Sequence, residues 1–429
     1  MKNLKKILAL TLALSAALAT TACGSGSAPA ASEQTCGCLR IESRHPHFYT
    51  ISEFEGMKGF MNDRNFGTVR MTVNRAVRQL SNAYVSLINS DTELRKFPSV
   101  MLWGAPGVGK SQGVRQIADE IGEKTGKKVT VTDVRLLLFN PVDLRGIPTA
   151  NEDKTLAVWL KPKIFQMDPS DGVINILFLD EISSAPQSVQ AAAYQITLDR
   201  TVGEHRLPDN CIVIAAGNRV TDRSVAYTMP KALANRLCHI EIEVDKNSWH
   251  EWALSSGINP VVLGFIDYNP SMLMGFDPSV NDLAFPTPRS WEMVSNILNH
   301  VSDNISDVFP LISGCVGDAA AYELRMWSEV YDKTPSLEDI FSGRPAGVPT
   351  RPEILYAVSS QIPAYSRDHR SETEINNAID YAARLGTEFR NKIFADMLQI
   401  GSIRAHLRKN SIYDDWFVRS GGDWEDYGL

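Results

Sequence analysis

The sequence predicts an α/β fold in which a parallel β-sheet is flanked by helices and is followed by a small helical domain and further helices. Three short apolar runs, 100–103, 173–179 and 211–216, each end in glycine or a polar residue, as buried parallel strands do. Beyond residue 248 the apolar residues recur at helical spacing instead. With 44% hydrophobic and 22% charged residues in a chain of 429, the composition indicates a globular protein of two or three domains and excludes the fibrous and disordered classes.

The first apolar run leads directly into a glycine-rich loop, Gly104-Ala105-Pro106-Gly107-Val108-Gly109-Lys110-Ser111, which Gln112 follows. This is the phosphate-binding pattern of a glycine, four residues and then Gly-Lys-Ser. Its backbone N–H groups point at the phosphates, Lys110 reaches the β and γ oxygens, and the Ser111 hydroxyl binds Mg²⁺. Apolar residues at helical spacing come next, so we expect the loop at the N-terminus of a helix, where the helix dipole favours an anion.

The other two runs end in polar residues suited to the same chemistry. The second run ends in Asp180 and Glu181. At the C-terminal end of a central parallel strand, Asp180 would hold Mg²⁺ and Glu181 would polarise the attacking water, the alternative being a core strand with a polar end. The third run closes at Gly217-Asn218, and we expect Asn218 to hydrogen-bond the water or the γ-phosphate from between the other two motifs.

Downstream of the third run, the pattern predicts a short helix at 230–237 that ends in Asn235-Arg236. A strand is expected at 239–244, where isoleucine and valine alternate with two glutamates as they do in a half-exposed strand. By residue type alone, Arg236 would be a solvated helix residue. Its place in the order of the motifs instead favours a catalytic role.

That order resembles the AAA+ ATPases and, within them, the MoxR-like group of the dynein-related AAA subfamily. The resemblance covers about residues 60–400, and segments 140–148 and 180–200 are similar to this group rather than to AAA+ proteins in general. It identifies 104–111 as the Walker A motif, 177–181 as Walker B, Asn218 as sensor 1, Arg236 as the arginine finger and Arg289, within 285–290, as sensor 2.

The resemblance implies a P-loop AAA+ core that binds ATP and Mg²⁺, hydrolyses ATP and assembles into a ring, usually a hexamer. Arg236 would act in trans on the γ-phosphate of a neighbouring subunit, beside the chain's own Lys110, Glu181 and Asn218. Arg289 would report the nucleotide state from the first turn of a lid helix. MoxR-like proteins commonly act as chaperones or remodellers, so the expected partner is a protein that carries a von Willebrand factor A domain.

The chain divides into an α/β domain at 60–245, a helical lid at 246–304, C-terminal helices at 305–410 and an acidic, aromatic tail at 411–429. Residues 144–161 have turn-forming residues between apolar flanks, the pattern of a hairpin. In the MoxR-like group an insert here faces the pore or a partner, and the alternative is a surface hairpin without function. Composition favours a disordered tail over a docking segment.

Two other functions stay compatible with the sequence. One is a nucleic-acid-associated motor or restriction component, because related AAA+ branches include both. The net charge of −7 argues against it, since there is no excess of Lys and Arg to displace counterions. The other is a non-enzymatic nucleotide-binding lipoprotein or scaffold, against which the complete set of hydrolytic positions argues.

Residues 1–40 resemble a bacterial lipoprotein signal and linker. Three lysines in the first six residues precede an apolar stretch, and Cys23 follows small residues as an acylated cysteine would, although Thr20 stands where the pattern has Leu. Membrane anchoring through Cys23 is the alternative to the cytoplasmic location that we expect from the ATP-consuming motifs. Met57 and Met61 are then alternative start positions.

Overall fold

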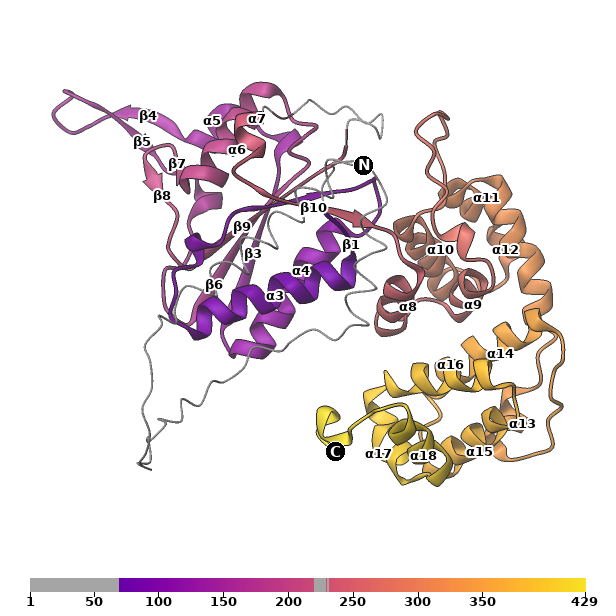
Figure 1. Cartoon of the computed structure of the whole chain (residues 1–429). Helices are drawn as coiled ribbons and strands as arrows, with labels where there is room; N and C mark the ends of the chain where they lie inside the picture. Colours follow the sequence, from indigo (N-terminus) through magenta and orange to yellow (C-terminus); the bar gives the residue numbers. More distant parts are fainter. Residues whose placement is uncertain (1–68, 220–228, 230) are drawn as a thin grey trace, which may run out of the picture. The chain divides into compact units, whose positions relative to one another are not determined.

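A computed structural model of the chain describes residues 69–219, 229 and 231–429 (Figure 1). The lipoprotein-like segment 1–40, with Cys23, and the start candidates Met57 and Met61 lie outside the described residues.

Within the described residues, six parallel strands form one sheet in the order β1-β10-β2-β9-β6-β3. The predicted α/β fold class is therefore confirmed. The strands are β1 (Val69–Thr72), β2 (Val100–Trp103), β3 (Lys128–Arg135), β6 (Val173–Asp180), β9 (Cys211–Gly217) and β10 (Cys238–Glu243).

Both faces of the sheet are covered by helices, which explains why the central strands are apolar throughout. Alternate residues of β6 pack on the two faces of the sheet: Ile176 and Phe178 in the cluster on one face, Leu177 and Leu179 in the cluster on the other. Figure 1 shows α3 and α4 on one face and α5, α6 and α7 on the other. These helices are α3 (Val73–Asn89), α4 (Lys110–Thr125), α5 (Pro141–Arg145), α6 (Gln187–Asp199) and α7 (Lys231–Ala234).

The strand order decides where the polar strand ends meet. Strand β9 pairs with β2 on one side and with β6 on the other. Because all three strands are parallel, their carboxyl ends lie at the same edge of the sheet. The residues after β9 therefore lie between those after β2 and β6, as the sequence predicted for Asn218.

Strand β10 lies inside the sheet, between β1 and β2, whereas the sequence led us to expect a half-exposed strand. The reason is β1, a four-residue strand that covers the outer edge of β10. Glu241 is therefore only 7% exposed, and its carboxylate pairs with Arg219 and with Arg70 of β1.

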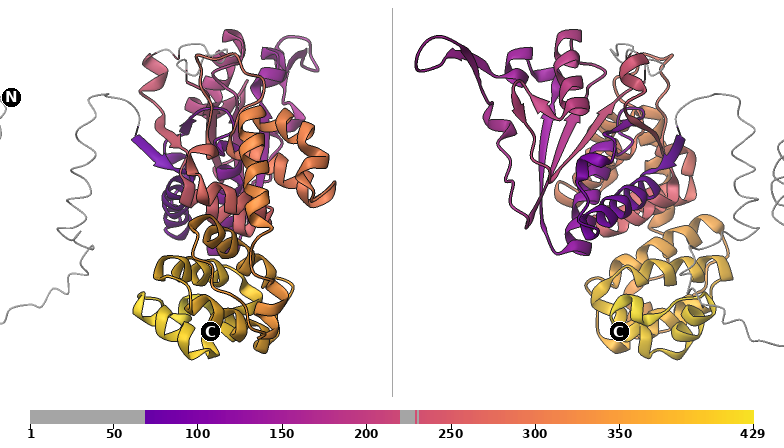
Figure 2. Two further views of the ribbon diagram at one scale, coloured as in Figure 1. Left: turned by 90° about the vertical axis from the view of Figure 1, so that its right-hand side faces the viewer. Right: turned by 60° about the vertical axis from the view of Figure 1, so that its left-hand side comes forward.

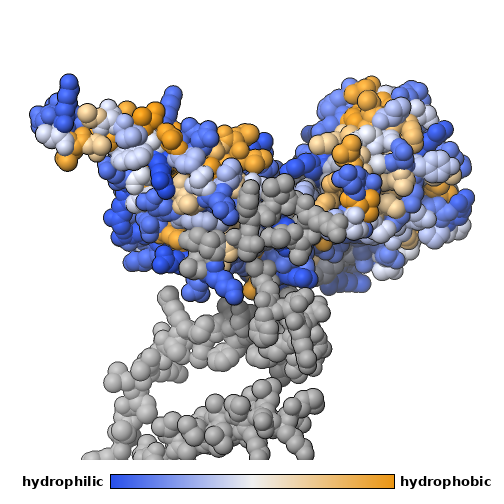
Figure 3. Space-filling model, turned by 90° about the horizontal axis from the view of Figure 1, so that it is seen from above, coloured by the Kyte–Doolittle hydropathy of each residue, from blue (hydrophilic) through white to orange (hydrophobic). Residues whose placement is uncertain are grey.

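The hairpin predicted at 144–161 is present as β4 (Ile147–Ala150) paired antiparallel with β5 (Ala157–Leu160). It projects from the sheet domain beside a smaller hairpin of β7 (Thr201–Val202) and β8 (His205–Arg206), and His205 Nε2 lies 2.6 Å from the Trp159 carbonyl oxygen (Figure 2). Figure 3 shows apolar side chains along this projecting part, and three of them are more than half exposed: Ile147, Leu156 and Leu160.

After the sheet domain comes a second hydrophobic core, in which Trp291 and Trp327 are buried and to which five α-helices contribute most of the residues. They are α8 (Lys246–Ser255), α9 (Pro260–Tyr268), α10 (Pro288–His300), α11 (Ile305–Val316) and α12 (Asp318–Tyr331). This core extends past residue 304, where we expected the lid to end, because α11 and α12 contribute to it.

A third core joins the last helices, and it includes the C-terminal tail. Tyr413 and Phe417, one helical turn apart, are buried, and Trp424 packs on Phe417 with ring centroids 4.1 Å apart. The expectation of a disordered tail is therefore wrong. No helix in the described ranges is both long and apolar enough to span a membrane. The helices of this part are α13 (Leu337–Ser342), α14 (Pro352–Tyr365), α15 (Glu372–Ala383), α16 (Thr387–Leu398), α17 (Arg404–Lys409) and α18 (Ser411–Arg419).

A buried ionic cluster connects the second and third cores. His250 of α8 contacts Asp267 of α9 at 3.1 Å and Asp396 of α16 at 2.9 Å. Lys392 of α16 lies 3.0 Å from Asp267 and 2.6 Å from Asp396. Burial alone would raise the pKa of Asp267, but His250 and Lys392 lower it well below its usual range.

Candidate nucleotide-binding site

The glycine-rich loop runs from the end of β2 to the start of α4, as predicted. Gly109 caps α4 with a φ of 97°, and Gly107 has a φ of 78°, a conformation that L side chains rarely adopt. A Cβ atom at Gly107 would lie 2.9 Å from the Thr287 hydroxyl, which belongs to the N-cap of α10. The loop thus passes so close to the lid that only glycine fits at this position.

Lys110 is the first residue of α4, and its ammonium group folds back over the loop. Nζ donates to the carbonyl oxygens of Gly104 at 2.7 Å and Ala105 at 3.0 Å, and to Oδ1 of Asn218 at 2.9 Å. The Asn218 backbone N–H in turn donates to the Ser183 hydroxyl at 2.9 Å. Asn218 therefore orients the lysine directly, a contact that the sequence did not predict.

Ser111 and Asp180 come together at the same edge. The Ser111 hydroxyl donates to Oδ2 of Asp180 at 3.0 Å. Hydroxyl and carboxylate oxygens are ligands that Mg²⁺ prefers, and this ion is usually held by one or two protein ligands with waters and phosphates. In the described part of the chain no group of three or more His, Cys, Asp or Glu could hold a metal. The Ser111–Asp180 pair thus fits Mg²⁺ bound together with a phosphate.

Glu181 follows Asp180 in a backbone conformation that is rare for a residue with a side chain. Its φ is 58°, and its backbone N–H donates to Oδ1 of Asp180 at 2.8 Å. Such a conformation costs about 1–3 kcal/mol and persists where the surrounding structure fixes it, often at functional sites. It turns the chain sharply at the end of β6, so both carboxylates line the same cavity.

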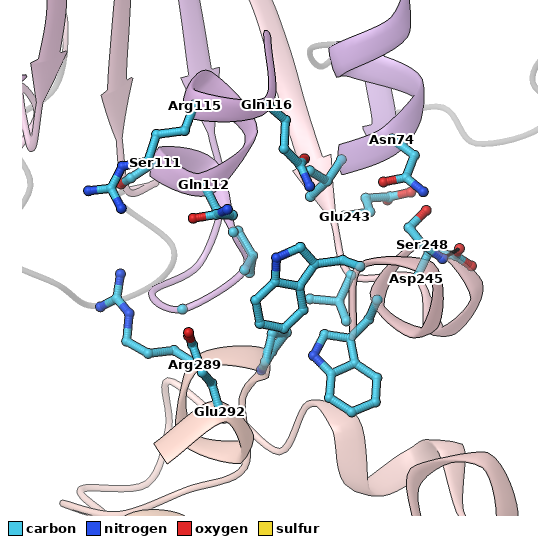
Figure 4. A pocket seen from close by; sticks show the side chains of 18 of the residues that line it. Asn74, Ser111, Gln112, Arg115, Gln116, Glu243, Asp245, Ser248, Arg289 and Glu292 are labelled. Atoms are coloured by element: carbon cyan, nitrogen blue, oxygen red, sulfur yellow. Dashed lines mark hydrogen bonds between the residues drawn. The ribbon is translucent and has the colours of Figure 1, made fainter. Parts of the chain in front are cut away.

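That cavity, of about 360 Å³, lies between the loop and the helices of the lid. Gly107, Val108, Gly109, Ser111 and Gln112 line it from the sheet domain, whereas Gly104, Ala105, Pro106 and Lys110 are not part of the lining. Arg289 lies in the first turn of α10, as predicted, and is exposed. Figure 4 shows its guanidinium rising from the lid toward the side that Ser111 and Arg115 occupy.

A comparison with known families identifies the domain that carries this cavity. Residues 99–239 match the model of the ATPase family associated with various cellular activities (AAA). An AAA domain spans this part of the chain. The match includes the loop, both carboxylates, Asn218 and Arg236, but not Arg289. No curated protein matched the sequence.

Solved structures that match at low identity include NtrX from Brucella abortus in complex with ADP, a RuvB mutant from Thermotoga maritima and PCH-2 from C. elegans. NtrX is 14% identical over 88% of this chain and 73% of its own, with a TM-score of 0.34. RuvB is 13% identical over 72% and 89%, with a TM-score of 0.31, and PCH-2 is 13% identical over 59% and 66%, with a TM-score of 0.30. TM-scores below 0.5 do not establish a shared fold over the full length of the chains.

The AAA domain also contains a cavity residue that sequence reasoning missed. Asp133 of β3 lines the cavity, one strand away from Asp180. Burial and the negative charge of Asp180 raise the pKa of Asp133. No motif marks Asp133. The only signal in the sequence was the alternation of polar and apolar residues along β3, which places Asp133 and Arg135 on the same face of this edge strand.

Arg236 lies apart from these residues. It is exposed, it follows the short helix α7, and it is not among the residues that line the cavity. Lys110, Glu181 and Asn218 instead gather at one edge of the sheet, where Lys110 donates to Asn218 and Glu181 lines the cavity.

Proposed function

We propose that this chain is an Mg²⁺-dependent ATP hydrolase that uses nucleotide turnover to remodel a partner protein. The observation that carries the proposal is the convergence on one edge of the sheet of the phosphate loop, the Ser111–Asp180 pair and the Lys110–Asn218 contact. These are a cation, a metal-binding pair and an oriented amide, which are the groups that phosphoryl transfer needs around a γ-phosphate.

Each group has a role that follows from its chemistry. Lys110 neutralises charge on the β and γ oxygens, and Asn218 holds the lysine and the attacking water in register. Glu181 polarises that water, because its carboxylate is the one at the strand end that does not accept the Ser111 hydroxyl. Ser111 and Asp180 would hold Mg²⁺, which screens the phosphate charge when it is bound.

Arg236 and Arg289 supply the remaining positive charge. Arg289 reaches the cavity from the lid of the same chain, so it senses whether a phosphate is present. Arg236 faces solvent outside the cavity, which suits a residue that acts on the nucleotide of a neighbouring subunit. We therefore propose a hexameric ring in which the next subunit completes each nucleotide site.

The projecting hairpin is the proposed contact to the partner. Three of its apolar residues, Ile147, Leu156 and Leu160, are more than half exposed and form a surface of the kind that marks a protein interaction site. By resemblance to MoxR-like proteins, we propose that this partner carries a von Willebrand factor A domain.

We place the chain in the cytoplasm, because its ATPase motifs require a supply of ATP. N-terminal sequencing of the native protein tests this location. An acylated Cys23 would overturn it in favour of a membrane-anchored lipoprotein, and a start at Met57 or Met61 would support it.

Hydrolysis is tested with the full chain and the Lys110→Ala variant. We expect wild type to release phosphate from ATP with Mg²⁺, and the variant to be slower by about 10²–10³-fold, because it loses a cation directed at the transferred phosphate. Glu329→Gln is the control, since Glu329 is an exposed residue of α12 remote from the loop. Equal rates in Lys110→Ala and wild type would contradict the proposal.

The partner is tested by capture with Glu181→Gln loaded with ATP, which holds the chain in its nucleotide-bound state. We expect a protein with a von Willebrand factor A domain to co-purify, and to be lost when Leu156 and Leu160 are replaced by serine. Recovery that does not depend on ATP or on the hairpin would argue against a remodelling role.

A further inference from the structure

Arg236 is carried by a piece of chain that has little stability of its own. Helix α7 is four residues long, Lys231–Ala234, and a helix of one turn is not stable without tertiary contacts. The turn after it is closed by a long backbone hydrogen bond, from Leu237 N–H to the Ala234 carbonyl oxygen at 3.2 Å. The direction of Arg236 must therefore be set by contacts from outside this turn.

His239 supplies one such contact. Its Nε2 lies 2.7 Å from the Ala234 carbonyl oxygen, two residues before Arg236. The second contact of the turn is the buried side chain of Leu237, which packs in the core on the α6 face of the sheet. The apolar packing of Leu237 holds the turn in place but does not fix its orientation. The hydrogen bond from His239 is directional, and it fixes the position of the Ala234 carbonyl oxygen.

The other ring nitrogen of His239 identifies its protonation form. Trp103 Nε1 donates to Nδ1 of His239 at 2.9 Å, and the two rings are nearly parallel, with 15° between their planes. An indole N–H can only donate, so Nδ1 is the acceptor. The proton of the neutral imidazole is then on Nε2, where it is donated to the Ala234 carbonyl oxygen.

Trp103 connects this pair to the nucleotide site. It is the last residue of β2 and directly precedes Gly104, whose carbonyl oxygen accepts from Lys110. The contacts thus run from the phosphate loop through Trp103 and His239 to the turn that carries Arg236.

We propose that His239, in its Nε2-protonated form, is a positioning residue that holds the Arg236 turn against the strand leading into the phosphate loop. The inference rests on the proposed trans role of Arg236 and adds the residue that aims it. A displacement of about 1 Å at a catalytic group can cost about 10²-fold in rate. His239 therefore governs turnover in the neighbouring subunit rather than in its own.

Variants of the full chain separate this role from a general structural one. His239→Phe keeps a planar ring and loses both hydrogen bonds, and we expect kcat to fall about 10–100-fold with unchanged affinity for ATP. His239→Gln restores activity to within a few-fold of wild type, because one amide can accept from Trp103 and donate to Ala234. The matched control is His369→Phe, since His369 stacks on Tyr365 and contacts Glu374 in the C-terminal core.

Mixed assemblies provide the decisive experiment. Arg236→Ala subunits have an intact site and no finger, and Glu181→Gln subunits have a finger and no water-polarising carboxylate, so an equal mixture should recover hydrolysis. With His239→Phe added to the Glu181→Gln subunit, we expect the recovery to be lost. With His239→Phe added to the Arg236→Ala subunit, we expect it to persist.

The opposite pattern, or recovery in both placements, would overturn the proposal for His239. No recovery in the parent mixture would instead show that Arg236 does not act in trans, and the inference would fall with that assignment. Trp103→Phe is the second variant if His239→Phe does not assemble, because it removes the indole donor and keeps an aromatic ring. Placed in the Glu181→Gln subunit, it should also abolish recovery, and full recovery would contradict the proposal.

Discussion

The polar groups around the phosphate loop and those of the ionic cluster between α8, α9 and α16 include the same kinds of side chain in different surroundings. In both, a lysine ammonium lies within 3.0 Å of oxygen atoms. At the loop, Ser111, Asp180 and Glu181 border a cavity of about 360 Å³. In the ionic cluster, the Asp267 side chain is 1% exposed and faces three basic side chains, two on α8 and one on α16.

The difference separates a site for a ligand from a structural joint. Around the loop, Lys110 is held by neutral carbonyl and amide oxygens, which a phosphate can replace because its charge attracts the lysine more strongly. In the ionic cluster, each charge faces an opposite charge in a buried place, so removal of one leaves another uncompensated. Changes at the first should alter turnover with little effect on stability, and changes at the second should do the reverse.

The largest effect is expected from Glu181→Gln. Loss of the carboxylate that polarises water should lower kcat by about 10²–10⁴-fold while ATP binding persists. Steady-state phosphate release and titration with a fluorescent ATP analogue measure the two quantities. Hydrolysis at the wild-type rate would show that another residue is the base. An unfolding midpoint far below that of wild type would contradict the expectation that changes at the loop have little effect on stability.

A loss of stability is expected from Lys392→Met. The variant removes the lysine that contacts both buried carboxylates, Asp267 and Asp396, and loss of one partner of a buried ion pair costs about 3–5 kcal/mol. Chemical denaturation followed by tryptophan fluorescence measures the shift. Lys409→Met is the matched control, because Lys409 is paired with Glu372 at an exposed position, where an ion pair contributes about 0–1 kcal/mol. Equal shifts in the two variants would contradict a structural role for the buried cluster.

Gly107→Ala should weaken nucleotide binding to a smaller extent. The left-handed conformation costs a residue with a Cβ about 1–2 kcal/mol, which corresponds to about 5–30-fold in affinity if the loop must rearrange. Gly126→Ala is the control, since Gly126 has a φ of 68° at the end of α4 and nothing near its missing Cβ. It should lower stability by a similar amount and leave ATP affinity unchanged. Equal loss of affinity in both would contradict the role of the loop.

The smallest effect is a pH dependence from His250. Burial alone would lower the pKa of His250, but its contacts with Asp267 and Asp396 outweigh burial and raise it. Its contribution to stability is therefore complete below the unfolded value of about 6.5 and is lost as the pH rises through the raised folded value. The wild-type denaturation midpoint should fall between neutral and mildly alkaline pH more than that of His250→Gln. If the denaturation midpoints of wild type and His250→Gln changed with pH in parallel, His250 would not be the source of the pH dependence.

Features with a strong local pattern could be predicted from the sequence. The apolar runs before Gly104, Asp180 and Asn218 became adjacent buried strands, because only a strand covered on both faces is apolar throughout. The hairpin at 144–161 also followed from its turn residues, and the start of α10 near Arg289 followed from the helical spacing of the apolar residues after it. These are local sequence patterns, and the predictions made from them were confirmed because the tertiary structure agrees with the local preferences.

Features that depend on distant contacts could not be predicted. Glu241 is buried because β1 joins the sheet edge, and no pattern in four residues announces that pairing. Asp133 becomes part of the site only because β3 is placed beside β6. The tail was misjudged from its acidic composition, although Tyr413, Phe417 and Trp424 provide enough apolar surface to hold it against the C-terminal core.

The three oxygen atoms that hold Lys110 have a consequence for how the site selects its ligand. Binding is an exchange reaction, in which a phosphate competes with the Gly104 and Ala105 carbonyls and with Asn218 for one cation. The measured affinity then reports only the difference between these bonds, so a ligand with little charge near the lysine gains almost nothing. A polyphosphate would win this competition, because its charge attracts the lysine more strongly than three neutral oxygen atoms do.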